Sequence, residues 1–342
     1  ITITSASQLA AALKTAKGGE VFDLAPGNYG MLSIANRTFS SPITFRSANT
    51  SRPATFAQTN IKGSNGINFD GVEFANPLKS GQGYWTPAVS LYGSSSISFN
   101  NVSVHGSLDN NAGNDGYGIY SRASSNVSVT NSNFSQLNKA VVVLSNQYVN
   151  IAGNVISDIR SDGFNFADVQ NVKIVANSFS NFHPVTGDHP DAIQFYTAGT
   201  TRSSSNIQIS DNLIAGSAGA RMQGIFMTTS TAGVLPYKNV TITNNTLIGT
   251  MWHGINVSDA SGVSITGNNV VTVPDPVYKT SWIQLTRVQG VLSGNSAKQI
   301  NVLSSPNLKS LNNTLNTVSQ ALADKLIQAW LTAHTGRAPA PT

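Results

Sequence analysis

The feature that most constrains this 342-residue chain is a short repeat that ends in asparagine. Each copy alternates apolar and polar residues, as a half-buried β-strand does. The copies recur at intervals of roughly 23 to 35 residues, the range of stacked solenoid repeats. The clearest copies are Val149–Asn154, Val172–Asn177, Ile207–Asn212, Val240–Asn245 and Val263–Asn268. Short strands without helices between them predict an all-β fold: a parallel β-helix with a few strands per coil and loops inserted at one corner.

The closing asparagines of this repeat have a structural interpretation. Asparagine tolerates the left-handed conformation that ends a strand, and its amide satisfies backbone groups of the turn. We therefore predict that Asn154, Asn177, Asn212, Asn245 and Asn268 stack into a ladder rather than bind a ligand.

Amphipathic helices are predicted near both ends of the chain. Ser7–Lys14 reads as a short helix that covers the open end of the first coil and hides its apolar edge. Ser319–Leu331 reads as a second helix that packs against the far end or the side. The predicted organisation is a β-helix domain over residues 1–315, including the N-terminal cap helix, and a C-terminal helix and tail over residues 316–342.

A second repeat changes its first residue from copy to copy into a chemically reactive one. The pattern is reactive group, small residue, apolar, variable, apolar, and its first residues are Lys139, Asp162, Asp191, Gln223 and His253. If each copy is one coil, these residues form a line with neighbours about 4.8 Å apart, and the line spans about 19 Å. We call this line the reactive row. Its length suits several sugar units rather than one small molecule.

Charge is concentrated beside the reactive row, although only 10% of the residues are charged. Arg160, His189 and Arg221 each stand two places before a member of the row. Asp162 and Asp191 are expected one coil apart, where two carboxylates titrate together. Such a pair suits acid–base catalysis, and it equally suits a calcium ion. The alternative is that each aspartate only caps a turn.

The remaining candidates are residues expected to contact a substrate. His189 lies in the proline-stiffened stretch 182–191, which reads as an inserted corner loop of the kind that carries binding. Its neighbours Asp188 and Asp191 are expected to orient it. Aromatic rings near the reactive row are suited to stacking on sugar rings. The further candidates are Arg160, Gln194, Gln223, Asn165, Tyr117, Tyr120, Trp252, Tyr196 and Phe226.

Composition limits the partners and the location. The net charge of +5 and the isoelectric point near 9.4 favour an anionic partner, and the absence of a Lys/Arg run argues against nucleic acid. Without cysteine there is no disulfide and no cysteine-based zinc site. No apolar run approaches the length of a membrane span. The chain begins with Ile1 and lacks a signal-peptide pattern, so we expect a mature secreted or periplasmic protein or a trimmed fragment. The oligomeric state is left open.

The repeat as a whole, with Leu24–Tyr29 and the following Ile43–Arg46, resembles the pectate-lyase-like right-handed β-helix superfamily. This superfamily includes pectate and alginate lyases, chondroitinase B, polygalacturonases and mannuronan C5-epimerases. The step Asp162-Gly-Phe is similar to the one that carries a catalytic aspartate in the polygalacturonases and epimerases. The step His253-Gly-Ile is similar to the one that carries their catalytic histidine. The chain lacks the adjacent aspartate pair and Arg-Ile-Lys of polygalacturonases, and it has Asp188-His-Pro-Asp where the epimerases have Asp-Pro-His.

The resemblance and the reactive row together predict an enzyme that cleaves a uronate-containing polysaccharide by β-elimination. This reaction needs a group that neutralises the uronate carboxylate, a base for the C5 proton and an acid for the leaving oxygen. The candidates are, in that order, Arg221 or Arg160; His189 or Lys139; and His253 or a tyrosine. A calcium ion held by Asp162 and Asp191 is a further neutralising candidate. The alternatives are a glycoside hydrolase that uses these two aspartates, a C5-epimerase, and a glycan-binding module without catalysis.

Overall fold

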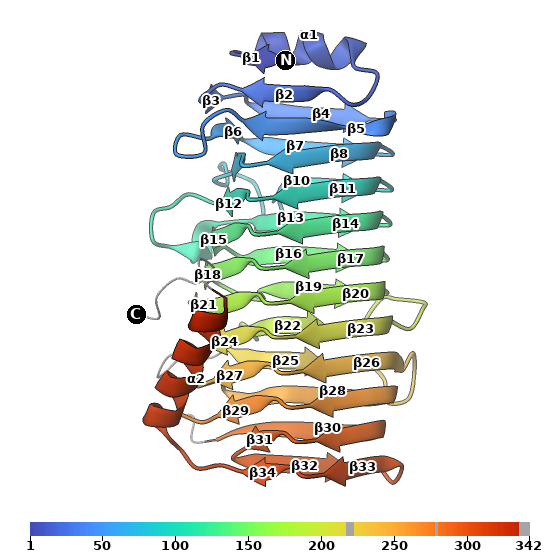
Figure 1. Cartoon of the computed structure of the whole chain (residues 1–342), viewed down its shortest axis with the longest axis vertical. Helices are drawn as coiled ribbons and strands as arrows, with labels where there is room; N and C mark the ends of the chain where they lie inside the picture. The colour runs from blue at the N-terminus through green and yellow to red at the C-terminus, as the bar shows by residue number, and fades with distance from the viewer. Residues whose placement is uncertain (217–221, 278–279, 335–342) are drawn as a thin grey trace.

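The protein is a parallel β-helix whose coils stack along the long axis of the molecule (Figure 1). The structure, a computed structural model, describes residues 1–216, 222–277 and 280–334. Every strand pairing in this part of the chain is parallel, and each coil contributes up to three strands on three faces. The predicted all-β solenoid is confirmed. None of the described helices is long and apolar enough to span a membrane.

The first face carries the reactive row at the starts of its strands. Its strands are β4 (Met31–Ala35), β7 (Gln58–Lys62), β10 (Pro87–Tyr92), β13 (Tyr117–Arg122), β16 (Lys139–Leu144), β19 (Phe164–Ala167), β22 (Asp191–Phe195), β25 (Gln223–Met227), the first parts of β28 (Trp252–Thr266) and β30 (Ser281–Ser293), and β32 (Gln299–Leu303). The register pairs Tyr117 with Lys139 and Asp191 with Gln223. The predicted one-coil step between row members is therefore present.

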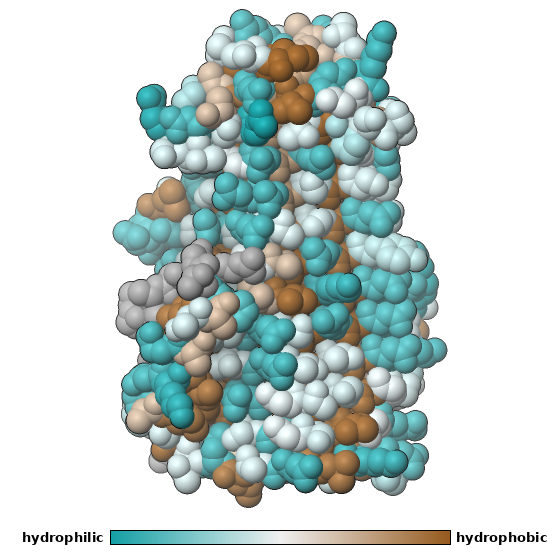
Figure 2. All heavy atoms as spheres, viewed as in Figure 1, coloured by the Kyte–Doolittle hydropathy of each residue, from teal (hydrophilic) through white to brown (hydrophobic). Residues whose placement is uncertain are grey.

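The second face contains the strands of the asparagine-ended repeat. They are β1 (Thr2–Ile3), β2 (Val21–Leu24), β5 (Thr38–Ser47), β8 (Asn65–Asp70), β11 (Ser95–Asn100), β14 (Ser125–Thr130), β17 (Gln147–Ala152), β20 (Gln170–Val175), β23 (Ser205–Ser210), β26 (Tyr237–Thr243), the later parts of β28 and β30, and β33 (Leu308–Leu311). Val149, Val172 and Ile207 occupy equivalent positions, as the period predicted. Figure 2 shows a narrow apolar stripe along the axis between polar flanks.

The third face consists of short strands and precedes a corner with inserted loops. Loops are also inserted at the next corner, between β22 and β23 and between β25 and β26, so the expectation of insertions at one corner is wrong. Its strands are β3 (Gly27–Asn28), β6 (Ala54–Phe56), β9 (Glu73–Ala75), β12 (Ser103–His105), β15 (Asn133–Leu137), β18 (Val155–Ile159), β21 (Ser178–Phe182), β24 (Leu213–Ala215), β27 (Thr246–Ile248), β29 (Asn269–Val271), β31 (Ser296–Ala297) and β34 (Thr314–Leu315). A 3-10 turn, η1 (Ala112–Asn114), lies in the loop between β12 and β13. The stretch 183–190 is such a corner loop, as predicted.

The core is a column of stacked apolar side chains inside the coils. Because successive coils pair in register, residues of the same type lie directly above one another. Phe45 stacks on Phe69 with ring centroids 5.0 Å apart, and Phe69 stacks on Phe99 at 5.2 Å. All three rings are completely buried. This rigid interior fixes where each strand of the first face begins.

The predicted asparagine ladder is present and runs along the corner between the second and third faces. Asn154, Asn177, Asn212, Asn245 and Asn268 are completely buried. The Oδ1 atom of Asn212 accepts hydrogen bonds from the backbone N and from Nδ2 of Asn177, at 2.9 and 3.0 Å. The Nδ2 atom of Asn212 donates to Asn245 Oδ1 at 2.9 Å and to the backbone oxygen of Ile174 at 3.0 Å. The same pattern links the other members, so the ladder satisfies turn groups that are closed to water.

Both predicted helices are present. Helix α1 (Ala6–Thr15) begins after Ser5, whose side chain accepts a hydrogen bond from the backbone N of Gln8. It lies over the first coil, with Leu9 buried, and so covers the open end (Figure 1).

The C-terminal helix packs along the side of the solenoid. Helix α2 (Gln320–Ala333) contacts the third face through Ala323, Ile327 and Trp330. The indole nitrogen of Trp330 donates to the backbone oxygen of Asp211 at 2.7 Å. The predicted tail, residues 336–342, lies outside the described residues.

Candidate active site

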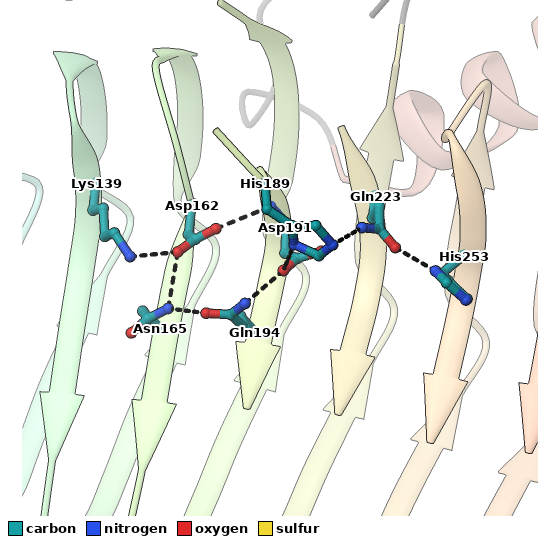
Figure 3. Close-up of polar contacts among 8 residues, drawn as sticks. All are labelled: Lys139, Asp162, Asn165, His189, Asp191, Gln194, Gln223 and His253. Atoms are coloured by element: carbon teal, nitrogen blue, oxygen red, sulfur yellow. Dashed lines mark hydrogen bonds and ion pairs between the residues drawn. The ribbon is translucent and has the colours of Figure 1, made fainter. Parts of the chain in front are cut away.

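The reactive row lies at the corner between the third and first faces, and its side chains form one connected polar network (Figure 3). Lys139, Asp191 and Gln223 begin strands β16, β22 and β25. Asp162 lies two residues before β19, and His253 is the second residue of β28. The period of the solenoid brings together residues that are 23 to 34 positions apart in the sequence.

Asp162 is a buried carboxylate surrounded by hydrogen-bond donors. Its side chain is 3% exposed, and its Oδ2 lies 2.5 Å from Nζ of Lys139. Asn165 Nδ2 donates to the same oxygen at 2.9 Å, and the backbone N of Asp191 donates to Oδ1 at 3.1 Å. Lys139 remains 20% exposed. Lys139, rather than Asp162, is therefore the accessible member of this pair.

Asp191 is completely buried and has a strongly perturbed acidity. Its Oδ2 accepts a hydrogen bond from Gln194 Nε2 at 2.8 Å and lies 3.3 Å from His189 Nδ1. Its Oδ1 is buried and has no hydrogen-bond partner. Burial raises the pKa of Asp191 to about 7, and the nearby charge of Asp162 also raises it, whereas the contacts with His189 and Gln194 lower it.

His189 is the exposed partner of this buried acid. Its side chain is 55% exposed, whereas that of Asp191 is fully buried. The hydrogen bond to Asp191 raises the pKa of His189 above its ordinary value, although partial burial opposes the shift. The expectation that Asp188 also orients His189 is wrong. The Asp188 carboxylate instead accepts two hydrogen bonds from Arg160, at 2.9 and 3.2 Å.

Arg160 is not the free carboxylate-binding group that was one of its two expected roles. Arg160 is bound to Asp188 and to the backbone oxygen of Gly113, so it fastens the 183–190 loop to the loop before β13. The contact with Asp188 raises the pKa of Arg160 further. Arg221 lies outside the described residues. Within the described network, Lys139 is the cation nearest the two buried aspartates.

The row ends at His253, which the side-chain amide of Gln223 links to His189. Gln223 is completely buried. Its Nε2 lies 2.6 Å from His189 Nε2, and its Oε1 lies 2.5 Å from His253 Nδ1. Burial, with a smaller contribution from His189, lowers the pKa of His253 to about 4. His253 is therefore neutral at neutral pH and is poorly suited to act as a proton-donating acid.

A pocket of about 400 Å³ opens beside Lys139 on the first face. Its lining combines aromatic, amide and cationic side chains: Tyr117, Tyr120, Lys139, Val142, Leu144, Asn165, Gln194 and Tyr196. Burial raises the pKa of Tyr117 to about 12, and nearby Tyr84 and Asp162 raise it as well. Tyr117 therefore keeps its phenolic proton. The predicted grouping of tyrosines and amides around the row is observed here.

Further aromatic rings lie along the reactive row beyond the pocket. Phe226 lies between the two histidine rings, with centroids 5.4 Å from His189 and 5.2 Å from His253. Trp282 lies 5.4 Å beyond His253. The sequence interpretation missed Trp282, although Ser281-Trp-Ile-Gln-Leu is one more copy of the row repeat and pairs with Trp252-His253. Trp252 itself is 46% exposed.

The aspartates do not fit the predicted calcium site. Calcium needs several free oxygen ligands, but Lys139 Nζ lies 2.5 Å from Asp162 Oδ2 and takes the position of a cation. Asp191 Oδ2 is occupied by Gln194 and His189. In the part of the chain that the structure describes, no group of three or more acidic, histidine or cysteine side chains could hold a metal ion. We derive no step through calcium.

Comparisons with known proteins agree with this fold. The family model described as a right handed beta helix region matches residues 59–184. No curated protein sequence matches the chain. An alginate lyase from Paenibacillus is similar in structure, with a TM-score of 0.50 and 16% identity over 90% of this chain and 98% of that one.

Two further solved structures are similar in fold. Endopolygalacturonase I from Stereum purpureum has a TM-score of 0.53 at 14% identity, covering 93% of this chain and all of that one. The Dettilon tailspike protein has a TM-score of 0.57 at 12% identity, covering 90% of this chain and 64% of that one. At these identities the likeness concerns the fold. The chain is therefore a right-handed parallel β-helix protein of the architecture found in polysaccharide lyases and polygalacturonases.

Proposed function

We propose that this protein cleaves a uronate-containing polysaccharide by β-elimination in the groove along the reactive row. The basic isoelectric point near 9.4 supports an acidic substrate. The row and the neighbouring pocket supply cationic, proton-carrying and aromatic groups over several coils. Such a surface matches a polymer whose repeating units each carry a carboxylate.

The observation that carries the proposal is the burial of both aspartates behind basic side chains. The side chains of Asp162 and Asp191 are 3% and 0% exposed, whereas those of Lys139 and His189 are 20% and 55% exposed. A sugar in the groove therefore meets an ammonium group and an imidazole, not a carboxylate. A glycoside hydrolase needs two carboxyl groups that reach the scissile bond from either side. The arrangement favours elimination over that alternative.

Three described side chains each have one role in the reaction. Lys139 pairs with the uronate carboxylate and so stabilises the negative charge that develops when C5 loses its proton. His189 in its neutral form takes that proton, and the C5–H electron pair forms the C4–C5 double bond. The C4–O bond then breaks, its electron pair stays on the leaving oxygen, and Tyr117 gives this oxygen a proton. Groups placed for proton transfer in this way typically contribute about 10²–10⁴-fold each.

The pKa directions agree with these roles. Tyr117, with a pKa of about 12, holds a proton to donate across the working range. The contact with Asp191 raises the pKa of His189, so its neutral form becomes dominant at a higher pH than for a free imidazole. We therefore expect activity to increase as the pH rises through the titration of His189.

The test is incubation with a panel of uronate polysaccharides while the ultraviolet absorbance of the unsaturated product is followed. The expected result is a rising signal that is lost in Lys139→Met and His189→Gln and kept in Lys173→Met. Lys173 is a matched control because it is exposed on β20 of the second face. New reducing ends without unsaturation would instead establish a hydrolase. Exchange of the C5 hydrogen without cleavage would establish an epimerase, and binding without either change would establish a glycan-binding module.

A further inference from the structure

Gln223 connects two histidine rings through the two ends of one amide. Its nitrogen faces His189 Nε2 at 2.6 Å, and its oxygen faces His253 Nδ1 at 2.5 Å (Figure 3). A side-chain amide donates at nitrogen and accepts at oxygen, whereas each imidazole nitrogen can do either. Since Gln223 is completely buried, neither end of the amide can turn to water instead. One ring must therefore accept a hydrogen bond from the amide nitrogen, while the other donates one to the amide oxygen.

Each orientation of the amide fixes a proton arrangement on both rings. In the orientation described, His189 Nε2 accepts and carries no proton, while His253 Nδ1 carries one and donates to Oε1. Rotating the amide by about 180° exchanges its oxygen and nitrogen, so the direction of both hydrogen bonds reverses while the side chain fills nearly the same space. His189 Nε2 then carries a proton, and His253 Nδ1 accepts. One orientation thus permits a charged His253 and the other permits a charged His189.

We infer that Gln223 is a positioning residue that makes the protonation of His189 and His253 mutually exclusive. A doubly protonated imidazole needs an acceptor at each engaged nitrogen, and a single amide oxygen cannot accept from both rings. If both rings were charged, the amide NH₂ would face an N–H group in a buried position, which is an unpaired and repulsive contact. The conclusion holds for either starting orientation. Its consequence for catalysis rests on the proposed function.

The surroundings determine which ring holds the charge at rest. His189 faces the Asp191 carboxylate through its other nitrogen, and Asp162 lies near enough to favour its charged form. His253 faces no carboxylate in its described contacts; the rings of Phe226 and Trp282 flank it. The proton is therefore held preferentially on His189. The lowered pKa of His253, partly caused by His189, agrees with this direction.

The coupling transmits the chemical state of His189 along the groove. When His189 gains a proton on Nε2, the amide turns its oxygen towards this nitrogen and its NH₂ towards His253 Nδ1. His253 then releases its Nδ1 proton to water and takes one on Nε2, with no net change in charge. The outer nitrogen of His253 thereby changes from an acceptor into a donor. Two coils from the base, the contact to the sugar chain changes with the protonation of the base.

The experiment is two-bond ¹H–¹⁵N correlation of the histidine rings during a pH titration of the intact protein without substrate. The spectrum separates the two neutral tautomers from the charged form. The chain has five histidines, and His189→Gln and His253→Gln assign the two of interest. The expected wild-type result is that His253 changes from the Nδ1–H to the Nε2–H tautomer at the midpoint at which His189 gains its proton.

Two substitutions at Gln223 test the role of the amide. Gln223→Met removes both contacts at similar volume, so His253 should no longer respond at the midpoint of His189. Gln223→Glu offers an acceptor to both rings, so both should become charged together, with raised pKa values. Gln208→Met is the matched control, since Gln208 is exposed on β23 of the second face, and it should leave the wild-type coupling intact. Thermal unfolding identifies a variant that has lost its fold.

The outcomes separate this inference from the proposed function. A wild-type His253 that stays unchanged through the titration of His189 would overturn the inference, and so would coupling that persists in Gln223→Met. Neither result depends on cleaving a polysaccharide. Conversely, a protein without lyase activity can still show the coupled titration. If elimination is confirmed, Gln223→Met should change the pH profile of kcat more than KM, which a merely structural role would not do.

Discussion

Replacing Lys139 with Met tests the buried ion pair on which the proposed chemistry depends. Met keeps most of the side-chain length but removes the ammonium. Asp162 then loses the donor at 2.5 Å and keeps Asn165 and the backbone N of Asp191, while remaining 3% exposed. Removing one partner of a buried pair costs about 3–5 kcal/mol. The two remaining hydrogen bonds and the 20% exposure of Lys139 place the expected loss near the lower limit, at about 3 kcal/mol.

The assay is urea unfolding of four proteins: wild type, Lys139→Met, Asp162→Asn and the double variant. A neutral amide at position 162 needs no counter-charge, so the double variant should regain about 2 kcal/mol relative to Lys139→Met. Lyase activity should remain lost in the double variant, because the ammonium is still absent. Lys173→Met should leave both stability and activity unchanged.

Two results would refute this reasoning. If Lys139→Met unfolds at the wild-type urea concentration, the ammonium does not stabilise a buried carboxylate. If the double variant is no more stable than Lys139→Met, the loss arises from packing and not from uncompensated charge. Full activity in Lys139→Met would in addition remove Lys139 from the mechanism.

Three further predictions concern the ladder, the buried acid and the proton donor. Asn212→Ala should lower the free energy of unfolding by about 4 kcal/mol, because the buried partners of one amide lose their bonds. Asn206→Ala, at an exposed position of β23, should lower it by only about 1 kcal/mol. Urea unfolding of both variants checks this. Because the folded pKa of Asp191 is raised to about 7, its contribution to stability is full below the unfolded pKa of about 3.9 and is lost as the pH rises to about 7. The stability of Asp191→Asn relative to wild type should therefore increase between pH 4 and 7, by on the order of 3 kcal/mol. A stability difference that is the same at both pH values would contradict the assignment. Tyr117→Phe should lower kcat at least about 10²-fold with little change in KM, and Tyr148→Phe, exposed on the second face, should have no effect; equal kinetics for the two variants would exclude Tyr117 as the acid.

The solenoid could be predicted from the sequence because its determinants are local and periodic. The alternation within Val149–Asn154 defines a strand, and its recurrence defines a coil. In a parallel stack, equal positions in successive copies must lie above one another. For that reason the asparagine ladder and the order Lys139, Asp162, Asp191, Gln223, His253 followed from the period alone. The same argument extends to Trp282, which lies in the copy that begins at Ser281.

The contacts that decide the chemistry did not follow from the period. Asp188 and His189 are neighbours in sequence, yet Asp188 is bound by Arg160, 28 residues away, which the preceding coil places beside the corner loop. A calcium site and a pair of accessible carboxylates were equally compatible with two aspartates one coil apart. Packing excluded both, since Lys139 occupies one carboxylate and the fold closes the other to solvent.

By itself, the sequence determined the parallel β-helix, its capping helix and the alignment of the reactive row, since a repeating chain that pairs in register leaves no other arrangement for equal positions. The tertiary structure alone decided how deeply each group is buried, which partners Asp191 and Gln223 find, and so which protons each side chain holds. Burial and hydrogen-bond partners depend on loops and neighbouring coils far apart in the chain, and it is these that turn a row of polar residues into candidate acids and bases.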